Sequence, residues 1–209
     1  MKIQAKAKNT RNYLFLLTGS RRGGNSETLA RRAAAALSDE TGQSWLRLLD
    51  LPLPVFEDIR HSGDGTYPPP GANGQILLEA TLAATDIVFV APLYWYGLPA
   101  PGKLYLDHWS GWMRLPNVEF KERMAGKTMW AITAYSDVDP NMAAPLCGTL
   151  RLSAEYMKMA WGGFLLGYGN APGDILQDQQ ALICADEFFA RPPERHAEPV
   201  RMREAAFCP

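Results

Sequence analysis

The chain has 209 residues, of which 47% are hydrophobic and 21% are charged, so it is long and apolar enough to bury one full core. Its formal net charge is −1 with both signs spread along the sequence, which excludes the electrostatic footprint of a nucleic-acid binder or a membrane-surface protein. No apolar run approaches the length of a transmembrane helix, and the basic N-terminal segment lacks the apolar core of a signal peptide, so we expect a cytoplasmic protein.

Buried, strand-like runs alternate with helix-like segments along the chain. In chain order, the expected elements are a strand at Tyr13–Thr18, a helix at Ser26–Ser38, a strand at Trp45–Leu49, a helix at Gln75–Ala84, a strand at Ile87–Ala91, a helix at Pro101–Trp112, a strand at Thr128–Thr133, a helix at Met142–Ala160, a strand at Gly163–Leu166 and a helix at Ile175–Ala190. This alternation predicts an α/β protein with a doubly wound, five-stranded parallel sheet and helices on both faces.

The first expected strand leads into a loop of small, polar and basic residues, Gly-Ser-Arg-Arg-Gly-Gly-Asn-Ser at 19–26, and then into a helix. The free N–H groups and the dipole of a helix N-terminus favour an anion. Glycines permit close backbone approach, serine and asparagine side chains offer donors, and the arginines add positive charge. Because the loop is neither a Walker A motif nor a dinucleotide fingerprint, we expect a terminal phosphate monoester. The alternative is an ordinary turn in which Asn25 or Ser26 caps the helix.

Three consecutive aromatic residues, Tyr94, Trp95 and Tyr96, follow the third expected strand after Pro92. Proline cannot donate to a strand ladder, so we expect the strand to stop there and the rings to lie on a loop. This loop and the glycine-rich loop both follow the carboxyl ends of parallel strands, which places them at one end of the sheet. A flat ligand with a phosphate at one end would fit both loops. Packing against the next helix or a subunit interface is the alternative.

Two regions depart from the alternating pattern. Residues 51–74 form a long segment rich in proline and glycine, which is typical of a functional or disordered loop. The tail from residue 191 is too rich in proline and charge to extend the last helix. We therefore expect a basic N-terminal arm at residues 1–12, one domain at residues 13–190 and a C-terminal extension at residues 191–209.

Two motifs together resemble a known family. Gly-Ser-Arg-x-Gly-Gly-Asn-Ser begins at Gly19, and Pro-x-Tyr-Trp-x-x-x-Pro-x-x-x-Lys-x-x-x-Asp begins at Pro92. In this order they resemble the flavodoxin-like NAD(P)H-dependent oxidoreductases, the FMN and quinone reductase group, over residues 13 to 170. The resemblance implies a flavodoxin-like strand order with FMN at the carboxyl ends of the strands. Lys103 and Asp107, four residues apart on an expected helix, form an exposed ion pair in this interpretation.

The resemblance also implies which residues bind the cofactor. The implied contacts to the FMN phosphate are Ser20, Arg22, Asn25 and Ser26. The implied contacts to the isoalloxazine ring are Pro92, Leu93, Tyr94, Trp95 and, on the loop after the fourth strand, Tyr135. The sequence shows neither a nucleophile–histidine–acid triad nor a metal-ligand constellation, so we expect no metal and no catalytic side chain, the redox chemistry being that of the cofactor.

The function implied is that of an FMN-dependent NAD(P)H oxidoreductase. NADPH or NADH would reduce the flavin, and a small-molecule acceptor such as a quinone, an azo or nitro compound or free flavin would then be reduced in a ping-pong cycle. A flavodoxin-type electron carrier without a small-molecule substrate is the alternative, although the net charge of −1 does not favour it. A flavin-free interaction module is a third interpretation.

We expect a homodimer or a homotetramer, and one helix offers a candidate interface. Tyr105, Trp109 and Trp112 are spaced by three or four residues on the expected helix Pro101–Trp112. The rings either form a dimer face that completes the partner's flavin site or pack in the core of their own subunit.

Overall fold

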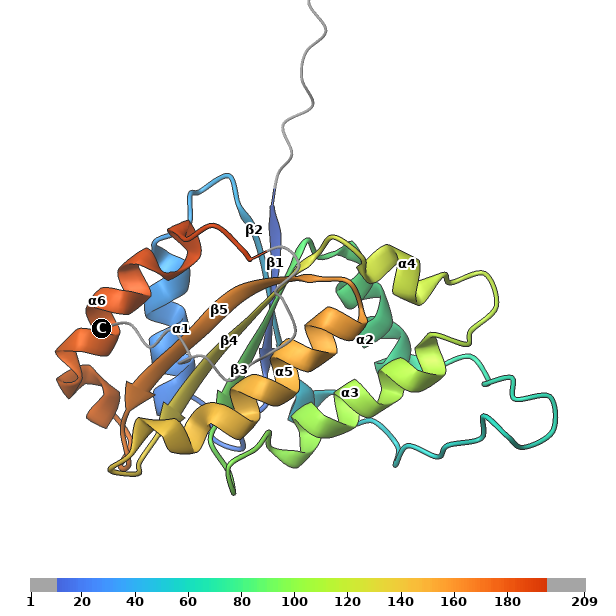
Figure 1. Ribbon diagram of the computed structural model, residues 1–209, viewed down its shortest axis with the longest axis horizontal. Coiled ribbons are helices and arrows are strands. Elements are labelled where there is room, and N and C mark those ends of the chain that lie inside the picture. The colour runs from blue at the N-terminus through green and yellow to red at the C-terminus, as the bar shows by residue number, and fades with distance from the viewer. Residues whose placement is uncertain (1–10, 195–209) are drawn as a thin grey trace, which may run out of the picture.

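The computed structural model describes residues 11–194 of the chain. A five-stranded parallel sheet in the order β2-β1-β3-β4-β5 forms its centre, and helices cover both faces (Figure 1). The predicted doubly wound α/β architecture is confirmed. Within the described residues, none of the helices combines the length and the apolar character needed to cross a membrane. The predicted arm, apart from its last two residues, and residues 195–209 of the predicted extension lie outside the described part.

The elements have the following bounds. The strands are β1 at Asn12–Leu17, β2 at Gly42–Arg47, β3 at Asp86–Pro92, β4 at Thr128–Tyr135 and β5 at Ala160–Tyr168. The helices are α1 at Asn25–Ala35, α2 at Ala72–Ala83, α3 at Ala100–Trp112, α4 at Phe120–Met124, α5 at Ala144–Tyr156 and α6 at Gln179–Glu187. Short 3-10 turns lie at Leu48–Asp50, Pro140–Ala143, Asp174–Gln177 and Phe188–Ala190.

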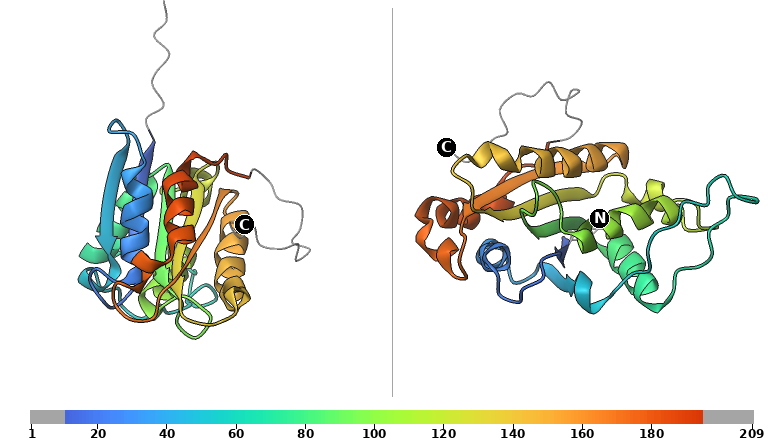
Figure 2. Two further views of the ribbon diagram at one scale, coloured as in Figure 1. Left: turned by 90° about the vertical axis from the view of Figure 1, so that its left-hand side faces the viewer. Right: turned by 90° about the horizontal axis from the view of Figure 1, so that it is seen from below.

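The three inner strands are buried on both faces because helices cover both sides of the sheet. Along β1, Leu14 and Leu16 pack into the core beneath α2, α3 and α5. The alternating residues Tyr13 and Phe15 pack into the second core, beneath α1 and α6. The two further views in Figure 2 show the sheet lying between α1 and α6 on one side and α5 on the other. Each inner strand therefore contributes alternating side chains to two cores.

The aromatic residues of α3 belong to the core of their own chain. Tyr105, Trp109 and Trp112 are all buried, and their rings contact one another and Phe120 edge-on. The interpretation of these rings as a dimer face is therefore wrong, and the core interpretation is confirmed. Assembly into a homodimer or a homotetramer itself stays a prediction.

At the amino end of the sheet, a buried carboxylate is satisfied by the chain. Asp86 at the start of β3 is 1% exposed. It accepts hydrogen bonds from Arg11 Nε at 3.0 Å, Trp130 Nε1 at 2.8 Å and Thr85 Oγ1 at 2.7 Å. Buried charges persist where they are paired and hydrogen-bonded. This cluster, which we call the Asp86 cluster, ties the start of β1 to β3 and β4.

Candidate functional site

A cavity of about 300 Å³ opens at the carboxyl ends of the strands. Its walls are the loops after β1, β3, β4 and β5, together with the first turn of α1. These loops lie along the lower edge of the sheet in Figure 1. Loops at this edge are where doubly wound sheets bind ligands, and the predicted meeting of the glycine-rich and aromatic loops is confirmed. An added Cβ on Gly19 would stand 3.1 Å from Pro92 Cδ, so the two loops touch.

The glycine-rich loop ends in a helix that no side chain caps. Gly24 is the N-cap of α1, with extended φ −69° and ψ 168°, and no side chain accepts a capping hydrogen bond. The alternative of Asn25 or Ser26 as the cap is therefore wrong. Asn25 instead bridges to the loop after β5, and Ser26 Oγ accepts from Ala134 N at 3.0 Å. Asn25, Ser26 and Glu27 in the first turn of α1 line the cavity, and within residues 11–194 their N–H groups have no hydrogen-bond acceptor, as an anion site requires.

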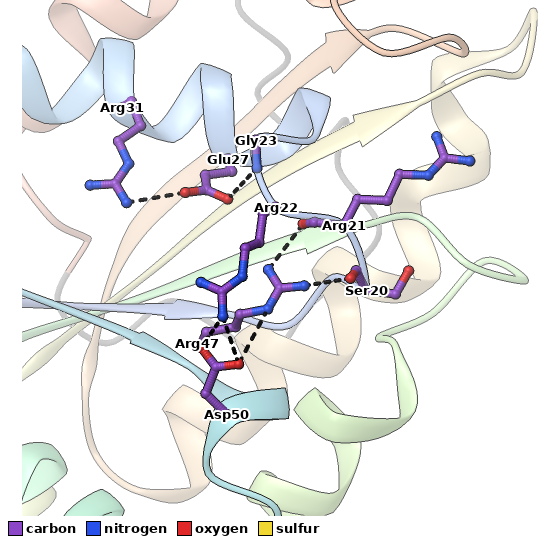
Figure 3. Close-up of polar contacts among 8 residues, drawn as sticks. All are labelled: Ser20, Arg21, Arg22, Gly23, Glu27, Arg31, Arg47 and Asp50. Carbon is purple, nitrogen blue, oxygen red and sulfur yellow. Dashed lines mark hydrogen bonds and ion pairs between the residues drawn. The ribbon is translucent and has the colours of Figure 1, made fainter.

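The two adjacent arginines of the loop point in different directions, as Figure 3 shows. Arg21 lines the cavity. Arg22 extends to Asp50, with Nη2 at 2.9 Å and 2.7 Å from its two carboxylate oxygens, and its side chain is 75% exposed. Arg22 is not among the lining residues, although the family resemblance implied it as a phosphate contact. The cation that the structure places at the cavity is Arg21.

A carboxylate also lies at the start of α1, and the chain occupies both of its oxygens. Glu27 Oε2 accepts from Gly23 N at 2.9 Å, and Oε1 pairs with Arg31 Nη2 at 3.1 Å (Figure 3). Gly23 has φ +64°, a conformation that favours glycine. Glu27 itself lines the cavity, but its negative charge is paired with Arg31. Within the described residues, the Arg21 side chain is in no ion pair and is available to an anion.

The aromatic loop forms a tight turn, and of its three rings only that of Tyr94 lines the cavity. Tyr94 N donates to Gly97 O at 3.3 Å and Gly97 N to Tyr94 O at 3.1 Å. Trp95 and Tyr96 between them have φ of 48° and 63°, as a two-residue turn with two left-handed positions requires. For residues with a Cβ, this conformation costs roughly 1–2 kcal/mol each. Pro92, Leu93 and Tyr94 line the cavity.

Two of the residues implied by the resemblance lie beside the cavity without lining it. Trp95 is 94% exposed at the tip of the turn. Ser20 Oγ lies 3.3 Å from the hydroxyl of Tyr94 and so joins the two loops at the rim. Of the nine residues implied as cofactor contacts, those that line the cavity are Asn25, Ser26, Pro92, Leu93, Tyr94 and Tyr135.

The loops after β4 and β5 complete the walls. Tyr135 and Ser136 after β4, and Gly169 and Asn170 after β5, line the cavity. Burial, followed by the charge of Asp178, raises the pKa of Tyr135, so its hydroxyl stays protonated at neutral pH. The hydroxyl can therefore donate a hydrogen bond to a ligand without placing a negative charge in the cavity.

The loop after β5 was missed by sequence reasoning. Asn25 Nδ2 donates to Ala171 O at 2.9 Å, and Asn25 Oδ1 accepts from Gly173 N at 3.0 Å. An added Cβ on Gly169 would stand 2.6 Å from Asn25 Nδ2, so a larger residue there would displace the Asn25 amide. The available signal was the run Gly-Asn-Ala-Pro-Gly at 169–173, which is typical of a turn and follows the last strand.

Comparisons with known proteins agree with the fold. The model of a family described as having the flavodoxin-like fold matches residues 12–186. A protein of Bacillus subtilis (strain 168), named as a candidate NAD(P)H-dependent FMN-containing oxidoreductase, is 33% identical over 174 residues, which is 83% of this chain and 93% of that protein.

Two solved structures share the fold. The structure titled as the Trp repressor binding protein from Bacillus subtilis has a TM-score of 0.68 at 27% identity, covering 87% of this chain and 99% of that one. The FMN-dependent NADH-azoreductase from Bacillus anthracis str. Ames Ancestor, solved in complex with FMN, has a TM-score of 0.62 at 14% identity, covering 87% and 98%. At that identity, the second likeness concerns the fold alone.

Proposed function

The chain belongs to the family with the flavodoxin-like fold, and from that premise we propose that it is an FMN-dependent NAD(P)H oxidoreductase that reduces a small-molecule acceptor. One observation carries the proposal: a single cavity joins an uncapped helix N-terminus and Arg21 to a wall of Pro92, Leu93 and Tyr94. A polar, cationic end beside an apolar, aromatic end suits a flat ring system that carries a phosphate.

The donors at the polar end fit a phosphate monoester. Arg21 supplies a full positive charge, and the free N–H groups of α1 supply the dipole and directed donors. Ser26 Oγ uses a lone pair to accept from Ala134 N, so its proton is free to donate into the cavity. Asn25 is held at both ends of its amide by the loop after β5, and it therefore braces the cavity wall. We propose that Arg21, Ser26 and the backbone N–H groups hold the phosphate.

The apolar end fits the ring. Pro92 and Leu93 present apolar side chains, and Tyr94 and Tyr135 present aromatic ones, each with a hydroxyl. These residues exclude water from the ring and offer hydrogen-bond donors at its edge. When FMN is bound there, it supplies the redox chemistry, taking up a hydride from NADPH or NADH and passing electrons to the acceptor in a ping-pong cycle.

The acceptor class follows from what lies at the rim. Tyr94, Trp95 and Tyr96 are 44%, 94% and 48% exposed, so flat aromatic surface faces the solvent beside the cavity. Rings of this kind stack on planar, conjugated molecules. We propose quinones, azo or nitro compounds or free flavin as acceptors.

The experiment is a visible spectrum of the purified chain after FMN has been added and excess flavin washed away. Under anaerobic conditions, we expect NADPH or NADH to bleach the retained flavin, and benzoquinone or an azo dye to restore its colour. Flavin that is retained but bleached by neither nicotinamide contradicts a reductase and favours an electron carrier. No retained flavin contradicts the cofactor assignment.

A pair of tyrosine variants ties the activity to this cavity. Tyr94→Ala removes a lining ring, and we expect slower bleaching and weaker retention of flavin. Tyr156→Ala removes an exposed ring of α5 that does not line the cavity, and we expect the wild-type rate. Equal rates in the two variants would place the reaction elsewhere on the protein.

A further inference from the structure

An arginine that does not line the cavity donates hydrogen bonds to the backbone of the glycine-rich loop. Arg47, the last residue of β2, has a side chain only 9% exposed. Its Nη1 donates to Arg21 O at 3.0 Å, and its Nη2 donates to Ser20 O (Figure 3). Arg47 does not line the cavity, and neither of the two sequence motifs includes it. One guanidinium thus binds two successive carbonyl groups of the loop.

These two hydrogen bonds fix the direction of the N–H groups that follow. In a trans peptide unit, the carbonyl of one residue and the N–H of the next point in opposite directions. When Ser20 O and Arg21 O are turned toward Arg47, the N–H groups of Arg21 and Arg22 are turned away from it. Among the described residues, neither N–H has a hydrogen-bond acceptor in the chain. They are donors with their direction already set.

An aspartate lies within ion-pair distance of Arg47. Asp50 Oδ1 lies 3.9 Å from Arg47 Nε, and Asp50 Oδ2 lies 2.7 Å from Arg22 Nη2. One carboxylate is shared by two guanidiniums, so the group of three keeps one net positive charge behind the loop. The same carboxylate keeps the Arg22 side chain on this side, away from the cavity. Arginine suits the task because its planar fork holds two acceptors in one fixed geometry, whereas the three donors of a lysine ammonium rotate about a flexible stem.

We propose that Arg47 is a positioning residue for phosphate binding: it orients the peptide groups of the glycine-rich loop toward the cavity before the ligand arrives. Arg47 does not touch the phosphate. Donors that are already oriented need no ordering when the ligand binds, and this lowers the cost of binding. The inference rests on the proposed function, because it takes the FMN phosphate to be the group that the loop binds.

The test compares two flavins that differ only in the phosphate. Binding of FMN and of riboflavin to the flavin-free full chain is followed by quenching of flavin fluorescence. For Arg47→Met, we expect the dissociation constant of FMN to rise about tenfold or more, as for the loss of directed hydrogen bonds to a charged group. We expect riboflavin binding to stay within about twofold of wild type, since the ring wall is untouched. The ratio of the two constants does not depend on how much protein is folded.

Two further variants separate geometry from charge. Arg47→Lys keeps the positive charge and loses the fork, so we expect most of the loss in FMN preference that Arg47→Met shows. It also replaces Arg47→Met in the comparison if that variant does not fold. Arg32→Met is the matched control, because it removes another arginine that is in an ion pair. Arg32 Nε lies 2.5 Å from Asp186 Oδ1, and neither residue lines the cavity. We expect wild-type constants for both flavins in this control.

The failures of the two proposals differ. If the wild-type chain binds FMN no better than riboflavin, the loop does not bind the phosphate and the proposed function loses its support. If wild type prefers FMN and both Arg47 variants keep that preference, Arg47 does not orient the loop. If Arg47→Lys retains the full preference while Arg47→Met loses it, charge alone is responsible and the positioning role is overturned.

Discussion

The two ends of the same sheet differ in whether their charged and polar groups have partners within the chain. At the amino end, the Asp86 cluster surrounds one buried carboxylate with donors from Arg11, Trp130 and Thr85. At the carboxyl end, the glycine-rich loop presents N–H groups to which the described part of the chain offers no acceptor, and Arg21 lies at the cavity. The chain itself satisfies the Asp86 carboxylate and leaves the N–H groups of the loop to a ligand.

This difference assigns separate roles to the two ends. A satisfied buried network fixes the strands relative to one another, and removing one member leaves the others without partners. Oriented donors at a solvent-accessible edge contribute little to folding, and they lower the free energy of a bound anion. Changes at the amino end should therefore alter stability, and changes at the carboxyl end should alter binding.

The largest effect is expected from Asp86→Ala. It leaves the Trp130 N–H and the Arg11 guanidinium without their acceptor and removes the nearer of two acceptors of the Thr85 hydroxyl. We therefore expect the free energy of unfolding to fall by about 3 kcal/mol. Urea denaturation measures this loss. Asp86→Asn, which keeps the shape and one acceptor oxygen, should lose less. A variant as stable as wild type would show that the Asp86 cluster does not hold the sheet.

The next effect concerns the neighbouring arginines of the loop. Arg21→Met should weaken FMN binding by about 1.5–3 kcal/mol, the range for a hydrogen bond to a charged group, with unfolding little changed. Arg22→Met is the matched control, because it removes only an exposed pair with Asp50, worth about 0–1 kcal/mol. Fluorescence titration with FMN separates them. A larger loss in Arg22→Met would restore the assignment made from the family resemblance.

Alkaline pH provides a third comparison. Burial, and next the charge of Asp86, raise the pKa of Tyr13, whose hydroxyl has no hydrogen-bond partner within residues 11–194. The unfolded chain therefore releases this proton at lower pH than the folded chain, and stability is lost as pH rises above about 10. Tyr13→Phe should remove up to about 1.4 kcal/mol of this loss per pH unit.

Tyr135→Phe is the control for the pH experiment. The pKa of Tyr135 is also raised, first by burial, but this residue lies at the solvent-accessible cavity. Its substitution should change the slope of stability against pH less than Tyr13→Phe does. Urea denaturation of both variants between pH 9 and 11 tests this order, and equal slopes would show that the two ends do not differ in solvent access.

The smallest effect is expected from inorganic phosphate. A phosphate ion bound by the glycine-rich loop should stabilise the flavin-free chain, by about 0.4 kcal/mol when its free concentration equals its dissociation constant. Thermal unfolding in phosphate and in chloride of equal ionic strength measures this shift. Arg21→Met should reduce it, whereas Asp86→Asn should retain it. A shift that is equal in all three proteins would reflect a general salt effect.

The sequence predicted the inner strands of the fold better than the edges. The strand expected at Tyr13–Thr18 lies within one residue of β1, because residues buried on both faces form a continuous apolar run. The edge strand β2 begins at Gly42, three residues before the expected strand, since its first residues are small and polar. Helix α4 was missed because five residues are too few to show a helical period.

The long helix expected at Met142–Ala160 illustrates a different limit. Helix α5 ends at Tyr156, and Lys158 then adopts φ 56°, a left-handed conformation that ends the helix before β5 begins. Nothing in a lysine side chain signals this conformation, which is typical of glycine and asparagine. The apolar run therefore extended the expected helix into the next strand.

The candidate site was predicted at the level of loops and less well at the level of side chains. Loop placement follows from strand order, so the sequence could predict where the glycine-rich and aromatic loops meet. The direction of Arg21 and Arg22 depends on Asp50, which is 28 residues away from Arg22, and on Arg47. Sequence spacing cannot show a contact at that separation. The predicted Lys103–Asp107 pair, at helical spacing, is confirmed with Nζ 2.5 Å from Oδ1.

The left-handed turn at the rim also gives the protein an intrinsic fluorescent probe, the indole of Trp95. Trp95 is 94% exposed, whereas Trp109, Trp112, Trp130 and Trp161 are buried. Trp45 is partly exposed, but its ring is stacked on Phe15 and covered by Arg31. An indole in water emits at longer wavelength than a buried one, so Trp95 contributes most to the red edge of the tryptophan emission. A molecule that binds against the rim excludes water from the Trp95 ring and should therefore shift that edge to shorter wavelength. Arrival of an acceptor can thus be followed without a label.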